Sequence, residues 1–224
     1  MVKQAFVAIF AAAFFCLSSL GEDRNGFVMV GKTAAPPVID GKLDDSCWKE
    51  TVTLTPFVLT KRNAFAKDQT KVRLVCGQQH LYAAFDCASA CLDPTSNRSH
   101  EFKREIRSSD VKNMCNKDEC VMLIVAPPLK EDVAFEFMVN ANAAVSDAKC
   151  DGPDYWQARD LSWNAGTTAK AAIGNGRWTV EMAIPLKAFG DTPKTGYTWR
   201  LAVGRLNKET KRVSAWQPMR TGLH

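Results

Sequence analysis

The chain has 224 residues, of which 24% are charged and 46% hydrophobic, and its formal net charge is +5. The basic residues occur as scattered pairs, at Lys61-Arg62, Lys103-Arg104 and Lys211-Arg212. Nucleic-acid-binding surfaces need a continuous basic stripe, so this scatter argues against one. The length allows one sizeable domain with its own hydrophobic core.

The N-terminus has the pattern of a secretory signal peptide. A short basic region precedes an apolar run from Ala5 to Leu20, and Ser19-Leu20-Gly21 offers small residues for a signal peptidase. The run is short for a membrane-spanning helix, and the residues before Cys16 do not suit a lipid anchor. We therefore expect residues 1–21 to be removed. The domain of residues 22–224 would then be secreted or periplasmic, with no membrane partner.

Seven of the eight cysteines follow this segment. Export favours disulfides, and an odd number leaves at least one thiol unpaired. Cys115 and Cys120 lie close in sequence, as do Cys87 and Cys91, but the spacing leaves the pairing open. A structural zinc site is disfavoured because no Cys-x-x-Cys pair occurs and the chain has three histidines.

The rest of the chain consists of short alternating segments separated by turns, and Asn175-Gly176 is the strongest turn signal. Only Leu186 to Phe189 has the pattern of a helical turn. The polar connection between 88 and 116 is long, and such loops tend to carry function. These features predict an all-β, antiparallel two-sheet sandwich. Strands are expected over 52–60, 71–76, 81–86, 120–126, 133–140, 167–173, 177–184, 199–206 and 212–216.

Several short segments follow one another along the chain: Ile39-Asp40-Gly41 to Trp48, Leu81-Tyr82, Asp118 to Val121, Phe135 to Asn140, Trp178 to Pro185 and Ser214-Ala215-Trp216. In this order they resemble the family 9 carbohydrate-binding modules and related DOMON-like sandwiches. The resemblance implies a jelly-roll-like fold that binds the ends of polysaccharide or oligosaccharide chains. Such modules are usually appended to exported glycoside hydrolases, sometimes with structural calcium. The family has a further strand after Ser-x-Trp, so we expect that strand to be missing here.

The family's sugar-binding positions diverge in this chain. Its tryptophan falls near Asn116, its glutamate on Met122 and its arginine on Met138. Sugar binding needs an aromatic face and polar groups at the ring edge. The candidate contacts are therefore Trp216, Arg205, Asn140 and Trp156, whereas Trp48, Trp178 and Trp199 are expected in the core.

A catalytic site is hard to assemble from these residues. The acidic pairs Asp44-Asp45 and Asp118-Glu119 are adjacent in sequence, so their side chains point apart and do not form a glycosidase dyad. They are better suited as solvated turn acids or calcium ligands. We expect no enzyme activity, and a role as a carbohydrate-binding accessory in polysaccharide breakdown.

Two alternatives remain open. In a haem or redox domain, Met122 or Met138 would be one axial ligand and His80 or His100 the other. In a structural or interaction module, the departures at Asn116, Met122 and Met138 would mark a lost sugar site. Methionine also serves as core filler.

Overall fold

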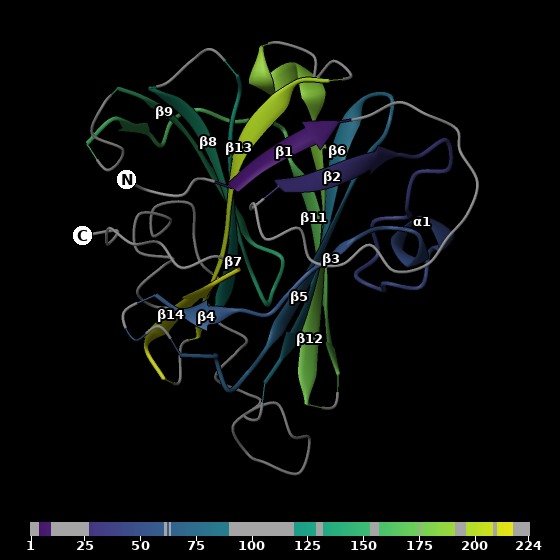
Figure 1. Cartoon of the computed structure of the whole chain (residues 1–224), viewed down its shortest axis with the longest axis vertical. Coiled ribbons are helices and arrows are strands. Elements are labelled where there is room, and N and C mark those ends of the chain that lie inside the picture. The colour runs from purple at the N-terminus through teal and green to yellow at the C-terminus, as the bar shows by residue number, and fades with distance from the viewer. Residues whose placement is uncertain are drawn as a thin grey trace.

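The computed structural model describes residues 5–9, 27–60, 62, 64–89, 119–128, 132–152, 157–174, 176–190, 196–207 and 210–216. Regular structure in these ranges is almost entirely β-strand. Figure 1 shows the strands in two facing layers. The prediction of an antiparallel two-sheet sandwich is confirmed.

One layer, sheet A, has seven strands. They are β10 (Arg159–Asp160), β9 (Val145–Asp151), β8 (Val133–Asn140), β7 (Cys120–Ala126), β13 (Thr198–Asn207), β14 (Arg212–Ala215) and β4 (Val58–Leu59). The other layer, sheet B, has six. They are β2 (Phe27–Lys32), β3 (Thr53–Leu54), β5 (Thr70–Cys76), β6 (His80–Ala88), β12 (Arg177–Pro185) and β11 (Thr168–Gly174).

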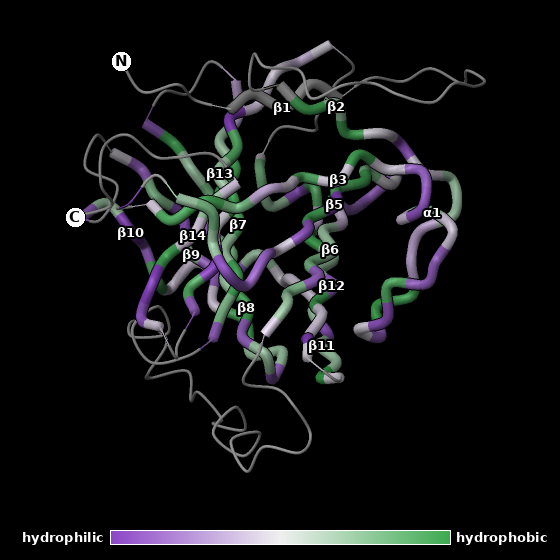
Figure 2. Tube along the Cα trace, turned by 60° about the horizontal axis from the view of Figure 1, so that its bottom comes forward, coloured by the Kyte–Doolittle hydropathy of each residue, from purple (hydrophilic) through white to green (hydrophobic). Residues whose placement is uncertain are grey.

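The core lies between the layers, where alternate residues of the strands point inward. Figure 2 shows how hydrophobic and hydrophilic residues are distributed along the strands. On β7 the inward residues are Val121, Leu123 and Val125, and on β12 they include Trp178 and Val180. Trp178 and Trp199 are buried here, as predicted. Trp48 is buried too, but it packs on the outer face of sheet B.

The predicted hairpins form as β5–β6, β7–β8, β11–β12 and β13–β14. The expected strand over 52–60 is instead two short strands in different sheets, since β3 pairs with β5 and β4 with β14. Phe57 lies fully buried between them. The chain therefore crosses from one layer to the other here, with Phe57 in the core.

Five of the described elements are additional to those expected: a short helix and the strands β1 (Ala5–Ile9), β2, β9 and β10. Helix α1 (Ser46–Lys49) buries Cys47 and Trp48, and β9 forms although four of its seven residues are polar. The predicted helical turn at Leu186–Phe189 is a 3-10 helix, η4. Within the described ranges, no helix has the length and apolar character needed to cross a membrane.

Strand β1 (Ala5–Ile9) falls inside the expected signal peptide. It pairs antiparallel with β13 and parallel with β2, and so joins the edges of the two sheets. Figure 1 shows β1 and β2 side by side across one end of the sandwich.

No disulfide joins any two of the five cysteines in the described ranges. Cys76 and Cys87 point into the main core, whereas Cys47 lies on the outer face of sheet B. Burial raises the pKa of Cys87 to about 12, so this thiol stays protonated. Cys91 and Cys115, which lie close in sequence to Cys87 and Cys120, are outside the described residues.

Candidate functional site

Arg205 occupies the interior of the sandwich at the end where residues 90–118 connect β6 to β7. It extends from sheet A and is 1% exposed. Its Nε donates to Glu119 Oε1 at 2.6 Å, and its Nη1 donates to the Ala88 carbonyl at 2.7 Å and to Thr70 Oγ1 at 3.3 Å. The guanidinium carbon lies 5.8 Å from the centre of the Trp178 ring.

This position gives Arg205 a structural role. Its guanidinium has no exposed surface with which to hold a sugar, because its partners lie inside the protein. Ala88 ends β6 and Glu119 immediately precedes β7. Arg205 therefore ties together both stems of the long connection between these strands.

Asn140 lies at the same end and is also buried. Its side-chain oxygen accepts hydrogen bonds from the backbone N–H groups of Asn142 and Ala144, at 3.0 and 2.8 Å. The neighbouring Ala141 N–H donates to the Glu119 carbonyl at 3.2 Å. Asn140 thus shapes the turn between β8 and β9, beside the Arg205–Glu119 pair.

Two aromatic residues, Trp216 and Trp156, were predicted to contact the sugar, and Trp216 lies within the described residues. It is partly exposed and packs against the main core. Its backbone N–H donates to the Val203 carbonyl at 3.2 Å, which fixes it beside β13. Trp156 lies outside the described residues. Trp163 packs on Phe135, with ring centres 5.3 Å apart.

The positions that correspond to polar sugar ligands in the family form an apolar cluster on the outer face of sheet A. Met122 and Met138 are directly opposite one another on β7 and β8, and both are buried with Cys120. Asn116 lies outside the described residues. On the same face, Glu136 of β8 forms a buried ion pair with Arg159 of β10. A charged residue inside an apolar alternating strand is the sequence signal for this pair.

His80 does not meet these methionines. Its ring lies against Tyr82, 5.7 Å between centres, and Tyr82 belongs to the cluster on the outer face of sheet B. His80 and the methionine pair therefore lie on opposite sides of the sandwich, which is wrong for two ligands of one haem iron. His100 lies outside the described residues.

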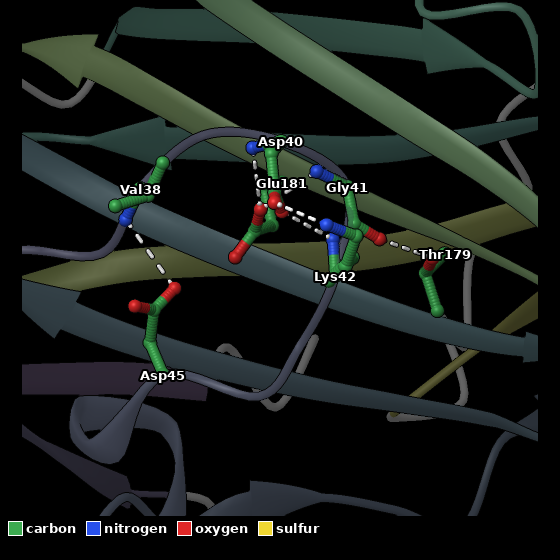
Figure 3. A network of polar contacts seen from close by, with 7 residues as sticks. All are labelled: Val38, Asp40, Gly41, Lys42, Asp45, Thr179 and Glu181. Carbon is green, nitrogen blue, oxygen red and sulfur yellow. Dashed lines mark hydrogen bonds and ion pairs between the residues drawn. The ribbon is translucent and has the colours of Figure 1, made fainter.

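Glu181 was not among the residues predicted from the sequence. It holds a segment over sheet B that we call the strap (residues 33–52). Its carboxylate accepts hydrogen bonds from the backbone N–H groups of Asp40 and Gly41 at 3.1 and 2.9 Å. The Trp48 Nε1–H donates to it at 2.8 Å. Figure 3 shows the Asp40–Gly41 turn over Glu181. Glu181 is the charged residue at the centre of an apolar strand, a pattern that could have identified it.

Close packing explains the Asp-Gly turn in the strap. Gly41 has φ +89°, and a Cβ there would lie 2.8 Å from the backbone carbon of Ala171. Thr179 Oγ1 donates to the Gly41 carbonyl at 2.5 Å. Only glycine fits this close approach.

Two of the candidate calcium ligands, Asp45 and Glu119, are engaged by protein groups. Asp45 accepts a hydrogen bond from the Val38 N–H at 3.3 Å (Figure 3), and Glu119 is paired with Arg205. Asp118 lies outside the described residues. In the part of the chain that the structure describes, three or more His, Cys, Asp or Glu side chains do not gather into a metal-binding group.

Solved structures share this architecture. A candidate carbohydrate-binding protein from Bacteroides uniformis matches 87% of this chain and 91% of its own, with a TM-score of 0.60 and 14% identity. A family 9 carbohydrate-binding module from Caldicellulosiruptor kristjanssonii, in complex with cellotriose, matches 84% of this chain and 82% of its own. Its TM-score is 0.52 and its identity 15%.

The chain has the fold of a family 9 carbohydrate-binding module. This confirms the fold that the ordered motifs predicted. No protein-family model matches the sequence, and the comparison with curated proteins finds no match. At this identity the likeness to family 9 modules lies in the arrangement of the strands and shows the fold alone.

Proposed function

We propose that this protein is a secreted or periplasmic, non-catalytic carbohydrate-binding module that assists polysaccharide breakdown. The observation that carries the proposal is the shared fold, over 84% of this chain, with a module whose structure holds cellotriose. Its ligands would be the ends of polysaccharide or oligosaccharide chains.

In this proposal Trp216 supplies the stacking surface. Its partial exposure supports that role, because an indole face covers a pyranose ring at low entropic cost. Asn140 and Arg205 contribute by shaping the turn and the loop stems at the same end of the sandwich. Trp156 is the proposed second aromatic contact.

The test is calorimetric titration of the exported protein with cellotriose. Trp216→Ala removes the stacking surface, so binding is expected to weaken at least about tenfold, as loss of an aromatic contact does. Trp216→Phe keeps an aromatic face and should retain most of the affinity. Tyr197→Ala is the matched control, because Tyr197 is an exposed aromatic residue outside the proposed site.

A second titration tests whether the protein recognises the reducing end of the ligand. Borohydride reduction opens the terminal ring, so loss of binding to reduced cellotriose would identify chain-end recognition. Absence of binding across a panel of oligosaccharides, with folded protein, would overturn the proposal. That result would favour an interaction module that has lost its sugar site, which the apolar cluster at Met122 and Met138 supports.

A further inference from the structure

Three sulfur-bearing side chains meet on the outer face of sheet A. Cys120 and Met122 are two residues apart on β7 and so point to the same side. Met138 of β8 is directly opposite Met122 in register. Directly opposed Cβ atoms lie about 4.5–5.5 Å apart and diagonal ones about 7–8 Å, so these flexible side chains can bring three sulfurs together.

The surroundings of this sulfur cluster are apolar and enclosed. Cys120 is 1% exposed, Met138 2% and Met122 7%. Ile124, Ala144 and Leu206 pack against them. Gly204 of β13 lies beside Met122, and a Cβ there would be 3.1 Å from the Met122 Cε. The missing side chain at Gly204 leaves room for the thioether.

A buried hydroxyl, that of Ser146, lies next to the sulfur cluster. Ser146 of β9 is directly opposite Met138 and is 3% exposed. Its Oγ has no hydrogen-bond partner among the residues that the structure describes. A buried hydroxyl without a partner is unfavourable, because the loss of its hydration is not offset by a hydrogen bond. The Ser146 Oγ is thus a buried polar atom, on the same face as Met138, that the described protein groups leave unpaired.

We propose that Cys120, Met122 and Met138 form a binding site for Cu(I). Thiolate and thioether sulfurs are soft ligands that select this ion over hard cations such as calcium or magnesium. Binding would release one proton from the Cys120 thiol, and the Cu–S bond would form on the resulting thiolate. Both thioethers would bind as neutral donors.

Charge also favours a monovalent ion. One thiolate and one Cu(I) sum to zero, so no net charge is left in the apolar cluster. A divalent ion would leave an unpaired positive charge, which is costly in such surroundings. The Glu136–Arg159 pair on the same face already balances its own charges.

The experiment is an anaerobic titration of the full reduced protein with Cu(I) against a chromogenic Cu(I) chelator, bicinchoninate. The wild type is expected to retain one Cu(I). Cys120→Ala should abolish this retention, and the double variant Met122→Leu/Met138→Leu should weaken it at least about tenfold. Leucine preserves volume and apolarity, so the fold should persist. Met182→Leu, at a buried methionine of the main core, is the matched control and should bind as wild type does.

Two other outcomes would contradict the proposed Cu(I) site. Equal Cu(I) retention by the double leucine variant would mean that cysteines alone bind the ion, through thiols such as Cys47 or Cys76. Equal loss in Met182→Leu would attribute the effect to packing. Circular dichroism of every variant checks the fold, and Met122→Leu alone provides a milder variant if the double one unfolds.

Discussion

Arg205 joins the two sheets through a single guanidinium that contacts β5, β6 and the residue before β7. Its Nη2 also lies 2.5 Å from Glu119 Oε1, although this N–H is not aligned for a hydrogen bond. Removing either partner would leave the other buried without the opposite charge that it pairs with here. The pair should therefore matter to stability more than a surface ion pair would.

Arg205→Ala is expected to lower the free energy of unfolding by about 3–5 kcal/mol, measured by urea denaturation. The double variant Arg205→Met/Glu119→Met should recover much of that loss, because no charge then remains unpaired. Strictly additive losses in the double variant would contradict this account. Lys42→Ala, which breaks an exposed ion pair with Asp40, is the control and should change little.

Glu181 is the other buried charge that organises its neighbours. Glu181→Ala leaves the Gly41 N–H and the Trp48 indole without their acceptor and leaves the Asp40 N–H with the Val38 carbonyl alone. The expected loss is more than about 2 kcal/mol of unfolding free energy. Thr179→Val removes one hydrogen bond from the same turn and should cost about 1 kcal/mol, so a reversed order would contradict this ranking.

The pH dependence at Glu181 has a defined sign. Burial raises the pKa of Glu181, and the hydrogen bonds from Trp48, Gly41 and Asp40 only partly offset it. The folded state therefore binds this proton more tightly than the unfolded state, whose pKa is about 4.3. Its contribution is complete below that value and is lost as the pH rises through the folded pKa. The stability of wild type relative to Glu181→Gln should thus fall as the pH rises from about 4 to 7. A flat difference would contradict the raised pKa.

At the scale of elements, the strap shows how the motif from Ile39 to Trp48, which lies outside the main core, contributes to the fold. Residues 33–52 carry Trp48 onto the outer face of sheet B, against Val75, Tyr82 and Ala183. This second, smaller core covers a face that would otherwise expose apolar side chains. The strap and β12 therefore depend on each other, which explains why their motifs occur together.

Strand β1 carries a prediction about maturation. We expect the exported protein to begin at Glu22, because signal peptidase would cleave after Gly21. Mass spectrometry of the exported protein checks this. The protein starting at Glu22 should still unfold in one cooperative transition, since β13 keeps its pairing with β7 after β1 is lost. Retention of residues 1–21 would instead make β1 a permanent link between the sheets.

At the scale of the whole molecule, alternation along single strands was enough to predict the sandwich. The β5–β6 and β11–β12 hairpins each combine adjacent alternating segments with a short turn, so local information defined them. The site was less predictable. Arg205 and Asn140 lie at one end of the sandwich and Trp216 lies beside Val203 of β13, and the inward direction of Arg205 depends on partners more than 80 residues away in sequence.

The sequence by itself determined the alternating strands, the turns between them and the aromatic residues of the core, because these follow from local periodicity. Only the tertiary structure decided that Arg205 and Glu181 serve as buried anchors. It alone also revealed the opposition of Met122 and Met138 and the unpaired hydroxyl of Ser146. The physical reason is that burial and cross-strand register are set by segments distant in the chain, which no local pattern records.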